Sequence, residues 1–573
     1  MTKNYAIAFR SHRVFKLAFL AFFLVSQLSF AQNWDWVSSA GGVGSDKGLD
    51  IDIDRYGNQY VCGYYNSGTS SGDVSFGAQA APLDFGKEGF LAKIDSNGTW
   101  QWVRGAMGGW DERALGMCVD NVNDFVYVTG TCWYNTGFGS CTGATFPGSG
   151  DEIFLGKFDL NGTCQWLIGA GSSSDDHGYD VVTDKLGNVY LTGFISNPYS
   201  AGMGVGTFGT INVPITPYDS LGFVAKVSPA GIFQWVKTFE ATDGERDNRI
   251  AIDTTGNLYV TGGFRGVKPF GTFTGTSNGG RDIFVIKYDS SGNLLWLRTA
   301  GGLLDDRGNS VAIDAHQDVY ITGELRDIVV FGTDTVNNNG GPNGRDIFVA
   351  KLTPAGSWVW AKKAGSTNGS DRGNRIIANK QDLLFVTGQF KGDASFGAAD
   401  TLINVADSVQ IYVAAIDTTG KWQWGIQAGS SIEDRGNGIA IDENCNIYTT
   451  GYYELTATFG SSAITAEGRK DIYVAKIPSA CIYNNVGISE DNPFEQVRYY
   501  PNPSIGNVTI ELGRFVEDVT VQVHNIVGQT LQTQKYQSTS KMDISIDGAN
   551  GIYFVHLITK KGESRVLKVI KEN

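Results

Sequence analysis

The chain has 573 residues, of which 75 are glycine; 12% of its residues are aromatic and only 18% are charged. This composition excludes a disordered chain, which has few aromatic residues and a high charge density. The net charge of −14 at pH 7 argues against a nucleic-acid partner held through phosphate contacts. Abundant turn residues together with many aromatic residues predict an all-β protein.

The first 31 residues have the composition of an export signal. A basic segment ends at Lys16, the apolar run LAFLAFFLV occupies 17–25, and the small residues Ser29 and Ala31 precede Gln32. The apolar run is too short to span a bilayer, which takes about 20 residues. We therefore expect residues 1–31 to be removed after passage through the Sec translocon, leaving a chain that is not transmembrane. A membrane anchor is the alternative.

Three sequence motifs recur seven times in the next 450 or so residues, which is the signature of a repeat architecture. A motif of the form GN-x-Y-V-T-G ends at Gly63, Gly130, Gly193, Gly262, Gly323, Gly388 and Gly451. An FVAK-like motif begins at Phe90, Phe154, Phe223, Phe284, Phe348, Tyr412 and Tyr473. A tryptophan-containing strand is expected at Trp36, Trp102, Trp166, Trp235, Trp296, Trp360 and Trp424.

Each repeat contains four short alternating segments, which we call A to D. In the fourth repeat they are 249–253 (RIAID), 257–262 (NLYVTG), 283–289 (IFVIKYD) and 294–300 (LLWLRTA). Asp- and Gly-containing turns join A to B and C to D, because an Asp side chain caps such a turn and Gly accepts its positive φ. Four strands per repeat, seven times over, predict a seven-bladed β-propeller across residues 32–480.

The order of the segments predicts how the ring closes. The first strand after the signal, at Trp36, is of type D, and the seventh repeat ends at 473–478 (YVAKIP) without a D strand of its own. We therefore expect the N-terminal strand to complete the last blade, which removes an open sheet edge.

Repeats such as 307–323 and 345–360 resemble the SBBP (seven-bladed beta-propeller) repeat family, and the resemblance covers about residues 34–480. The second repeat departs from the pattern, with NDFVYVTG at 123–130. The resemblance implies the propeller fold, and the family carries no common chemistry, so it leaves the function open.

The D–A loops carry the recurrent sequence Asp-Arg-Gly-Asn and should encircle one mouth of the central channel, on the face that also carries the long B–C connections. Exposed aromatic residues near them are further candidates for ligand binding. The candidate ligand-binding residues are Asp111, Asp176, Asp306, Arg307, Asp371, Arg372, Asp434, Arg435, Trp110 and Trp133. The alternative is a structural role, in which Asp–Arg pairs join neighbouring blades and the Asp side chains cap turns.

The sequence shows no catalytic constellation, and we expect no cofactor. No HExxH sequence or metal-spaced histidine cluster is present, and no G-x-S-x-G elbow with the chain order of a catalytic triad is evident. Asp50 and Asp52 alternate on the first A strand, so a calcium site there is an alternative to no metal at all.

The seven cysteines follow no CxxC spacing, which argues against zinc. Export permits disulfides. We expect Cys132 to pair with Cys141 within one loop, and as a weaker expectation Cys445 with Cys481.

Residues 481–491 are predicted to be a linker, and the alternating segments of 492–573 predict a small immunoglobulin-like β-sandwich. Several motifs there closely resemble the type A C-terminal sorting domain of the type IX secretion system of Bacteroidota. The matching residues are Tyr500, Pro501, Asn502, Pro503, Gly528, Gln529, Gly551, Tyr553 and Lys568. The resemblance implies recognition by the type IX secretion machinery and delivery to the cell surface or the medium. An ordinary adhesive sandwich domain is the alternative.

Together these features predict an exported, non-catalytic surface or extracellular protein that binds or adheres to a glycan or protein ligand. One alternative is a secreted polysaccharide-active enzyme, a lyase or hydrolase, with an acidic site at the channel mouth. Another is a structural component of the cell envelope.

Overall fold

The computed structural model describes residues 32–572, apart from short gaps. The gaps are 67–73, 83–85, 109, 134–135, 143, 145, 149, 198–202, 241–247, 339–343, 368, 398–399, 405–407, 479–496, 527 and 561–563. In the described ranges every regular element is a β-strand, and no helix there is long and apolar enough to cross a membrane. The described residues form two compact units, 32–478 and 497–572. The predicted signal (1–31) and linker (481–491) lie outside them.

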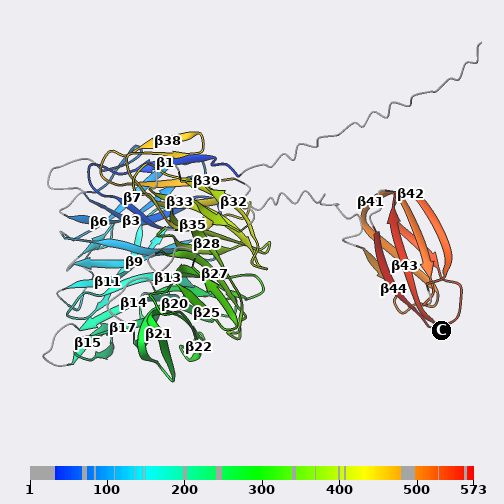
Figure 1. Ribbon diagram of the computed structural model, residues 1–573, viewed down its shortest axis with the longest axis horizontal. Coiled ribbons are helices and arrows are strands. Elements are labelled where there is room, and N and C mark those ends of the chain that lie inside the picture. Colours follow the sequence, from blue (N-terminus) through cyan, green and yellow to red (C-terminus); the bar gives the residue numbers. More distant parts are fainter. Residues whose placement is uncertain are drawn as a thin grey trace, which may run out of the picture. The chain divides into compact units, whose positions relative to one another are not determined.

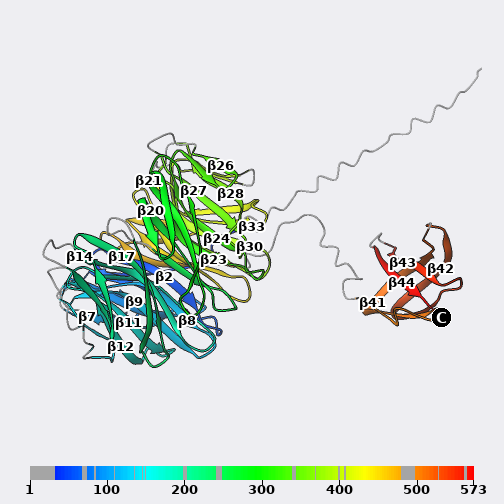
Figure 2. The ribbon, with the colours of Figure 1, turned by 90° about the horizontal axis from the view of Figure 1, so that it is seen from below.

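The larger unit is a seven-bladed β-propeller, as the repeats predict (Figure 1, Figure 2). Each blade has a core of four antiparallel strands, and the innermost strand of each blade packs beside its counterparts around the channel. The innermost strands are β2 (Lys47–Ile53), β8 (Arg113–Asp120), β13 (His177–Thr183), β19 (Arg249–Ile252), β23 (Arg307–Ile313), β29 (Arg372–Ala378) and β35 (Arg435–Ile441).

The remaining strands of each blade follow outward from the channel. The second strands are β3 (Gln59–Asn66), β9 (Phe125–Trp133), β14 (Val189–Asn197), β20 (Leu258–Phe270), β24 (Val319–Leu325), β30 (Leu383–Lys391) and β36 (Ile447–Tyr453). The third strands are β6 (Lys87–Ile94), β11 (Asp151–Asp159), β17 (Asp219–Val227), β21 (Phe273–Tyr288), β27 (Asp346–Leu352), β33 (Val409–Asp417) and β39 (Asp471–Ile477). The outer strands are β7 (Trp100–Met107), β12 (Cys164–Gly171), β18 (Phe233–Glu240), β22 (Leu294–Ala300), β28 (Trp358–Ser366), β34 (Trp422–Ala428) and β1 (Trp36–Ala40).

The recurrent Asp and Tyr of each repeat fix the turn between the first two strands. In the first blade the Asp54 carboxylate accepts hydrogen bonds from the backbone N–H of Tyr56 (2.9 Å) and Asn58 (2.8 Å), and the Tyr60 hydroxyl donates to it at 3.1 Å. Tyr259 and Tyr320 donate in the same way to Asp253 and Asp314. Equivalent bonds in several blades explain why this motif repeats with fixed spacing.

The N-terminal strand closes the ring, as predicted. β1 pairs antiparallel with β39, with Trp36 opposite Lys476 and Ser39 opposite Tyr473. The first and last parts of the larger unit therefore share one sheet, and the edge that β39 would otherwise expose is covered.

The hydrophobic core lies between neighbouring blades. One cluster, for example, joins Ile51 and Phe90 of the first blade to Tyr448 and Val474 of the seventh. Both faces of each sheet therefore bury apolar side chains, which is why the strands are rich in aromatic and β-branched residues.

Small hairpins between the second and third strands cover the outer strands. Each carries a recurrent Phe-Gly pair whose Phe is buried; Phe76 packs edge-on against Trp100 with ring centroids 5.0 Å apart. In the fourth blade the hairpin continues β20 and β21. The separate hairpin strands are β4 (Ser75–Phe76), β5 (Gln79–Ala80), β10 (Gly137–Phe138), β15 (Gly204–Phe208), β16 (Ile211–Ile215), β25 (Ile328–Phe331), β26 (Asp334–Asn337), β31 (Ala394–Phe396), β32 (Asp400–Leu402), β37 (Thr456–Phe459) and β38 (Ser462–Thr465).

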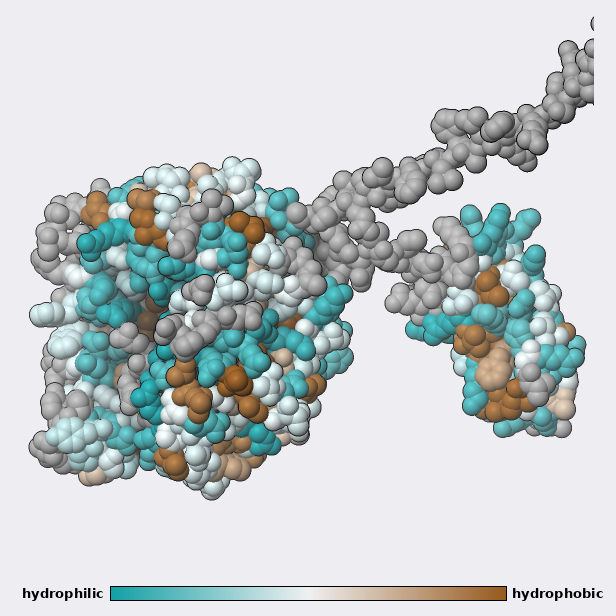
Figure 3. All heavy atoms as spheres, in the orientation of Figure 1, coloured by the Kyte–Doolittle hydropathy of each residue, from teal (hydrophilic) through white to brown (hydrophobic). Residues whose placement is uncertain are grey.

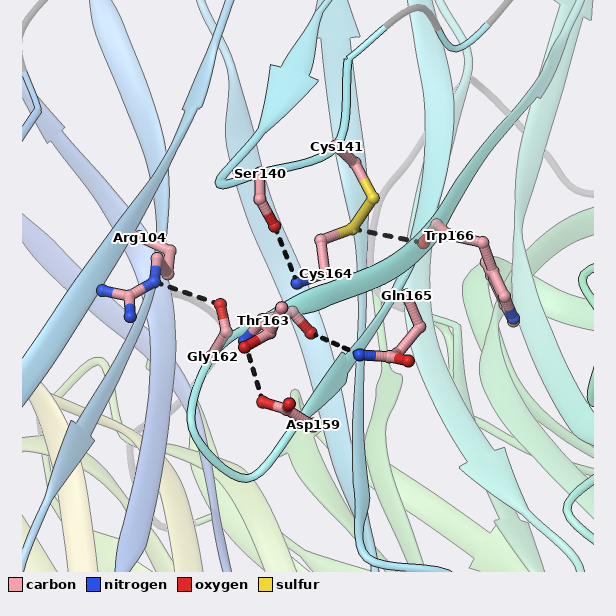
Figure 4. Close-up of a disulfide and its surroundings, with 9 residues drawn as sticks. All are labelled: Arg104, Ser140, Cys141, Asp159, Gly162, Thr163, Cys164, Gln165 and Trp166. Atoms are coloured by element: carbon pink, nitrogen blue, oxygen red, sulfur yellow. Dashed lines mark hydrogen bonds between the residues drawn. A yellow bond between two sulfur atoms is a disulfide. The ribbon is translucent and has the colours of Figure 1, made fainter.

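The disulfide of the second blade differs from the prediction. Cys141 is bonded to Cys164 at the start of β12, and not to Cys132 (Figure 4). Cys132 is a free, fully buried thiol on β9, whereas the loop after β10 brings Cys141 to β12, where the Ser140 hydroxyl also accepts a hydrogen bond from the Cys164 N–H. Proximity in sequence was therefore misleading. Cys445 is also disulfide-bonded, and its expected partner Cys481 lies outside the described residues.

The smaller unit is a five-stranded sheet that curls around its own apolar core, in keeping with the predicted sandwich. Its strands are β40 (Arg498–Tyr500), β41 (Asn507–His524), β42 (Thr530–Ser545), β43 (Gly551–Thr559) and β44 (Ser564–Lys571). The pairing of β41 with β42 shifts register between Glu511 and Val516, so the first half of β41 pairs with β40 and β42 and the second half with β42 and β43.

The surface of this unit exposes apolar side chains, among them Ile505, Phe515 and Ile526. Figure 3 shows hydrophobic atoms gathered on the face in view. An exposed apolar surface on so small a unit is typical of a domain that another protein recognises.

Candidate functional site: the channel mouth

The central channel opens into a cavity of about 250 Å³ where the innermost strands begin. Its lining includes five arginines and a histidine: Arg113, Arg249, Arg307, Arg372, Arg435 and His177. We call this cavity the channel mouth. Each of these six residues is the first of its strand, and all but Arg249 share one position of the repeat, so the repeat itself places basic groups around the opening.

The Asp of the recurrent Asp-Arg-Gly-Asn sequence holds its loop in place through hydrogen bonds to the backbone, away from the cavity. Asp306 is fully buried, and its two carboxylate oxygens accept hydrogen bonds from the backbone N–H of Gly302 (2.8 Å) and Arg326 (2.7 Å). The predicted ligand residues Asp176, Asp371 and Asp434 make equivalent pairs of backbone bonds. Backbone capping, which was the structural alternative, therefore accounts for these carboxylates. The other part of that alternative, pairing of these Asp residues with Arg, does not account for them.

The Gly and Asn of the sequence join neighbouring blades. A Cβ atom on Gly373 would lie 2.1 Å from the Thr322 hydroxyl oxygen of the preceding blade, so only glycine fits there. The Asn374 side-chain amide donates to the Gly436 carbonyl of the next blade at 2.8 Å. Asn309 and Asn437 donate in the same way to the carbonyls of Gly373 and Gly48, each in the next blade.

The arginine of the sequence lines the cavity with its side chain. Among the described residues, Glu324 is the single carboxylate in the lining; it lies 2.6 Å from Arg372 Nε, 2.9 Å from Arg345 Nη1 and 3.9 Å from Arg307 Nε. At the rim, Arg435 and Lys470 pair with Glu433. Arginines outnumber carboxylates in the lining, so the channel mouth is positive within a strongly acidic chain.

The pKa of Lys47, the first residue of β2, is affected by these basic neighbours. Burial, followed by the charges of Lys470 and Arg435, lowers the pKa of Lys47 to about 8. Its ammonium group lies 4.6 Å from the ring centroid of Tyr452, a cation–π contact that holds it at the rim.

Two buried carboxylates and two partly buried arginines form the floor of the channel mouth. Arg375 on β29 reaches across the channel to Asp50 on β2 and to Asp180 on β13, at 3.3 Å from the latter, and Arg249 lies 3.6 Å from Asp180. These residues come from four blades and occupy the same repeat position, where other blades have Gly or Ser. The network makes the channel mouth a blind pocket. The sequence already marks these four residues, because they place charges at a repeat position that is otherwise Gly or Ser.

The network also bears on the predicted calcium site. The Asp50 carboxylate pairs with Arg375 and accepts a bond from the Met117 N–H, and the Asp52 carboxylate accepts one from the Val119 N–H at 2.7 Å. In the part of the chain that the structure describes, no group of three or more His, Cys, Asp or Glu residues is arranged to hold a metal. The Asp50 and Asp52 carboxylates are therefore bound by donors of the chain itself, and the calcium site stays a prediction.

Behind the channel mouth, a second acid adjoins the loop-fastening Asp at most blade junctions. Burial, followed by the charge of Asp176, raises the pKa of Glu152 to about 9, and burial raises that of Asp176 to about 8. Burial likewise raises the pKa of Asp306, which lies beside Asp282, and that of Asp46, which lies beside Asp471, in each case to about 7. Two such carboxyls in low dielectric cannot both ionise freely. The repeat motifs did not reveal these pairs.

One blade departs from the basic pattern of the channel mouth. His177 replaces the Lys or Arg found there in most other blades, its Nδ1 lies 3.5 Å from the Tyr179 hydroxyl, and its Nε2 lies 3.6 Å from Asp151. Both His177 and Tyr179 line the cavity. His177 was not among the predicted site residues, although its departure from the repeat marks it.

The two predicted tryptophans lie together. Trp110 and Trp133 have ring centroids 5.8 Å apart, and Trp110 is 65% exposed. The neighbouring Asp111 pairs with Lys87 (2.5 Å) and with Arg113 (3.3 Å), which lines the channel mouth. The aromatic pair is thus tied to the rim of the cavity.

The predicted sorting residues bind the two ends of the smaller unit together. The Asn502 amide donates to the Lys568 carbonyl at 3.0 Å and its carbonyl oxygen accepts from the Ile570 N–H at 2.7 Å. The Tyr553 hydroxyl donates to the Ala549 carbonyl. Tyr500, Pro501, Pro503, Gly528, Gln529 and Gly551 lie in the adjoining strands and turns.

Two known families match parts of the sequence. The beta-propeller repeat (SBBP) matches residues 423–452, and the secretion system C-terminal sorting domain matches residues 498–572. The chain thus carries an SBBP repeat within its propeller and a type IX secretion sorting domain at 498–572. This domain directs the propeller to the cell surface or the extracellular space.

More distant relatives add no functional argument. An uncharacterized WD repeat-containing protein of Acanthamoeba polyphaga mimivirus is 22% identical over 389 residues, 56% of this chain and 28% of that protein. Regulatory protein FlaEY of Caulobacter vibrioides is 25% identical over 146 residues, 25% of this chain and 15% of that protein, so the chain spans less than a third of either relative. The solved structure of a mutant puromycin hydrolase has a TM-score of 0.37 at 9% identity, covering 81% of this chain and 58% of that one.

Proposed function

We propose that this exported propeller is a non-catalytic binding protein whose ligand enters the channel mouth. The observation that carries the proposal is the division of roles in Asp-Arg-Gly-Asn: Asp, Gly and Asn hold the ring together, while Arg faces the cavity. Basic groups placed by a rigid scaffold around a blind pocket are suited to ligand recognition.

The lining argues against glycoside hydrolysis. Hydrolases of this kind use two carboxyl groups that flank the scissile bond. Among the described residues that line the channel mouth, Glu324 is the single carboxylate, and three arginines surround it. Within the described lining, no second carboxyl stands beside Glu324 to complete the acidic site of the enzymatic alternative.

His177 and Tyr179 favour one second candidate, a lyase acting on uronic-acid polysaccharides. In such a β-elimination a base removes the C5 proton, the C4–O4 bond breaks, a C4=C5 double bond forms, and the departing oxygen takes up a proton. The Tyr179 and His177 side chains offer the base and the arginines offer a partner for the substrate carboxylate.

A glycan array probed with the chain from residue 32, followed by product analysis on every hit, separates these functions. Binding without new products is the result that we expect. An unsaturated product, seen by the ultraviolet absorbance of its conjugated double bond, would replace binding by the lyase function, and loss of that product in Tyr179→Phe would assign the base. An array without any hit would contradict both.

A further inference from the structure

Basic side chains outnumber acidic ones in the lining of the channel mouth. The chain as a whole carries −14, yet five arginines and one ion-paired carboxylate line the channel mouth. Nucleic-acid partners are held by a basic stripe or patch that follows a backbone. A single blind pocket instead fits one anionic group at the end of a ligand.

Three consecutive blades each place an arginine in this pocket. Arg307, Arg372 and Arg435 begin β23, β29 and β35, and the Asn residue two positions later fastens each strand to the next blade. Their guanidinium groups are therefore placed by a rigid ring. Planar guanidinium groups bind carboxylates through paired hydrogen bonds, which makes arginine more selective for them than lysine.

The floor limits how far a ligand can enter. Arg375, Asp50 and Asp180 bridge the channel below the cavity, so a polymer cannot thread through the ring. A volume of about 250 Å³ accommodates a group the size of one sugar residue.

The tryptophan pair offers the surface that a sugar needs beyond its charge. Trp110 is mostly exposed and lies against Trp133, and Asp111 links this pair to Arg113 at the rim. An indole face presents a large rigid apolar area, on which the C–H face of a pyranose ring packs. An acidic peptide would use the arginines but has no such need of the tryptophans.

From these observations we infer that the ligand is an acidic glycan, whose terminal uronic-acid carboxylate binds the arginines of the channel mouth while a following sugar packs on Trp110. The inference rests on the proposed function and names the ligand class for the same site.

Calorimetry on the chain from residue 32 tests this. The probes are galacturonate, mannuronate and glucuronate oligomers, the same oligomers as neutral methyl esters, and a glutamate-rich peptide. At least one acid oligomer should bind, and its ester should bind at least about tenfold more weakly, since hydrogen bonds to a charged group are lost. Arg372→Gln and Trp110→Ala should each weaken binding of the acid about tenfold.

Arg55→Gln serves as the matched control, because Arg55 is an exposed arginine on the turn after β2, at the opposite end of that strand from the channel mouth, and should leave binding unchanged. Equal binding of acid and ester would overturn the anionic part of the inference while the binding function stands. Binding of the peptide alone would overturn the glycan class and also leave the function standing. If no acidic oligomer binds, the inference is wrong, and hits on other members of the array would then show that only the ligand class had failed.

Discussion

Within the Asp-Arg-Gly-Asn sequence, four adjacent residues do four different things. Asp306 caps backbone N–H groups, Gly308 packs closely against Thr261, and Asn309 bonds the next blade, whereas Arg307 faces the cavity. The repeat in register predicted that these residues surround the channel. It could not separate the roles, because periodicity shows where a residue recurs and not which way its side chain points.

The paired carboxyls predict an unusual dependence of stability on pH. Glu152 and Asp176 have folded-state pKa values of about 9 and about 8, above their unfolded values, so folding binds protons. The stability that they contribute is complete below about pH 4 and is lost as pH rises through about 8 to 9. In urea unfolding, the free energy of unfolding of Glu152→Gln should therefore exceed that of the parent chain by about 1–3 kcal/mol at pH 8 and should nearly equal it at pH 4.

Blade 6 already carries this replacement, since Gln410 stands beside Asp434 where Glu152 stands beside Asp176. Glu433→Gln is the control of opposite sign, because its basic partners, working against burial, hold the pKa of Glu433 down at about 2. That variant should be less stable than the parent chain above pH 5 and should equal it near pH 2. A Glu152→Gln effect independent of pH would contradict the shared-proton interpretation.

The floor network makes a second prediction at this scale. Arg375→Met leaves Asp50 and Asp180 buried without their main partner, which should cost about 3–5 kcal/mol of folding free energy in denaturant unfolding. Arg55→Met, which breaks an exposed pair with Asp124, should cost less than about 1 kcal/mol. Equal losses in the two variants would show that the network does not stabilise the ring.

At the scale of the elements, strand type and order were predictable because the Asp-Gly turns and the alternating aromatic residues recur with little variation. The disulfide was not, because its pairing depends on where the loop after β10 runs, and no periodic signal records that path. His177 and the charged residues of the floor were visible in the sequence as departures from the repeat. Only the structure shows that His177 lies beside Tyr179 and that Arg375 pairs with Asp50.

Ring closure by β1 can be tested by truncation. A chain that begins at residue 42 lacks β1 and leaves β39 as an open edge. Compared with a chain that begins at residue 32, it should melt at a clearly lower temperature and aggregate, since an unpaired edge strand invites association. Equal melting temperatures and a monomeric elution profile for both would contradict the closure.

The observed disulfide makes a distinct prediction. Replacing Cys141 and Cys164 together by serine opens a closed loop with a sequence separation of 23 and should cost about 2–4 kcal/mol in unfolding free energy. In the unreduced, denatured parent chain, an alkylating reagent should label Cys132 and leave Cys141 unlabelled, as read by peptide mass mapping. Labelling of Cys141 would show that the observed disulfide does not form.

At the scale of the whole molecule, the propeller and the sorting domain were both predictable, because each rests on several motifs in a fixed order. The charge distribution was not, since the sequence places the acidic and basic members of each loop side by side. Folding turns the Asp residues inward to the backbone and leaves arginines around one cavity. The lining of this cavity is therefore basic, although the chain as a whole carries a net negative charge.

The central claim is that an exported acidic propeller uses this pocket to bind an acidic sugar. A crystal structure of the chain from residue 32 with the tightest-binding uronate oligomer tests it most directly. We predict the terminal carboxylate in the channel mouth, hydrogen-bonded to at least one of Arg307, Arg372 and Arg435. An oligomer bound elsewhere, or one whose uncharged groups fill the mouth while its carboxylates face solvent, would contradict the account.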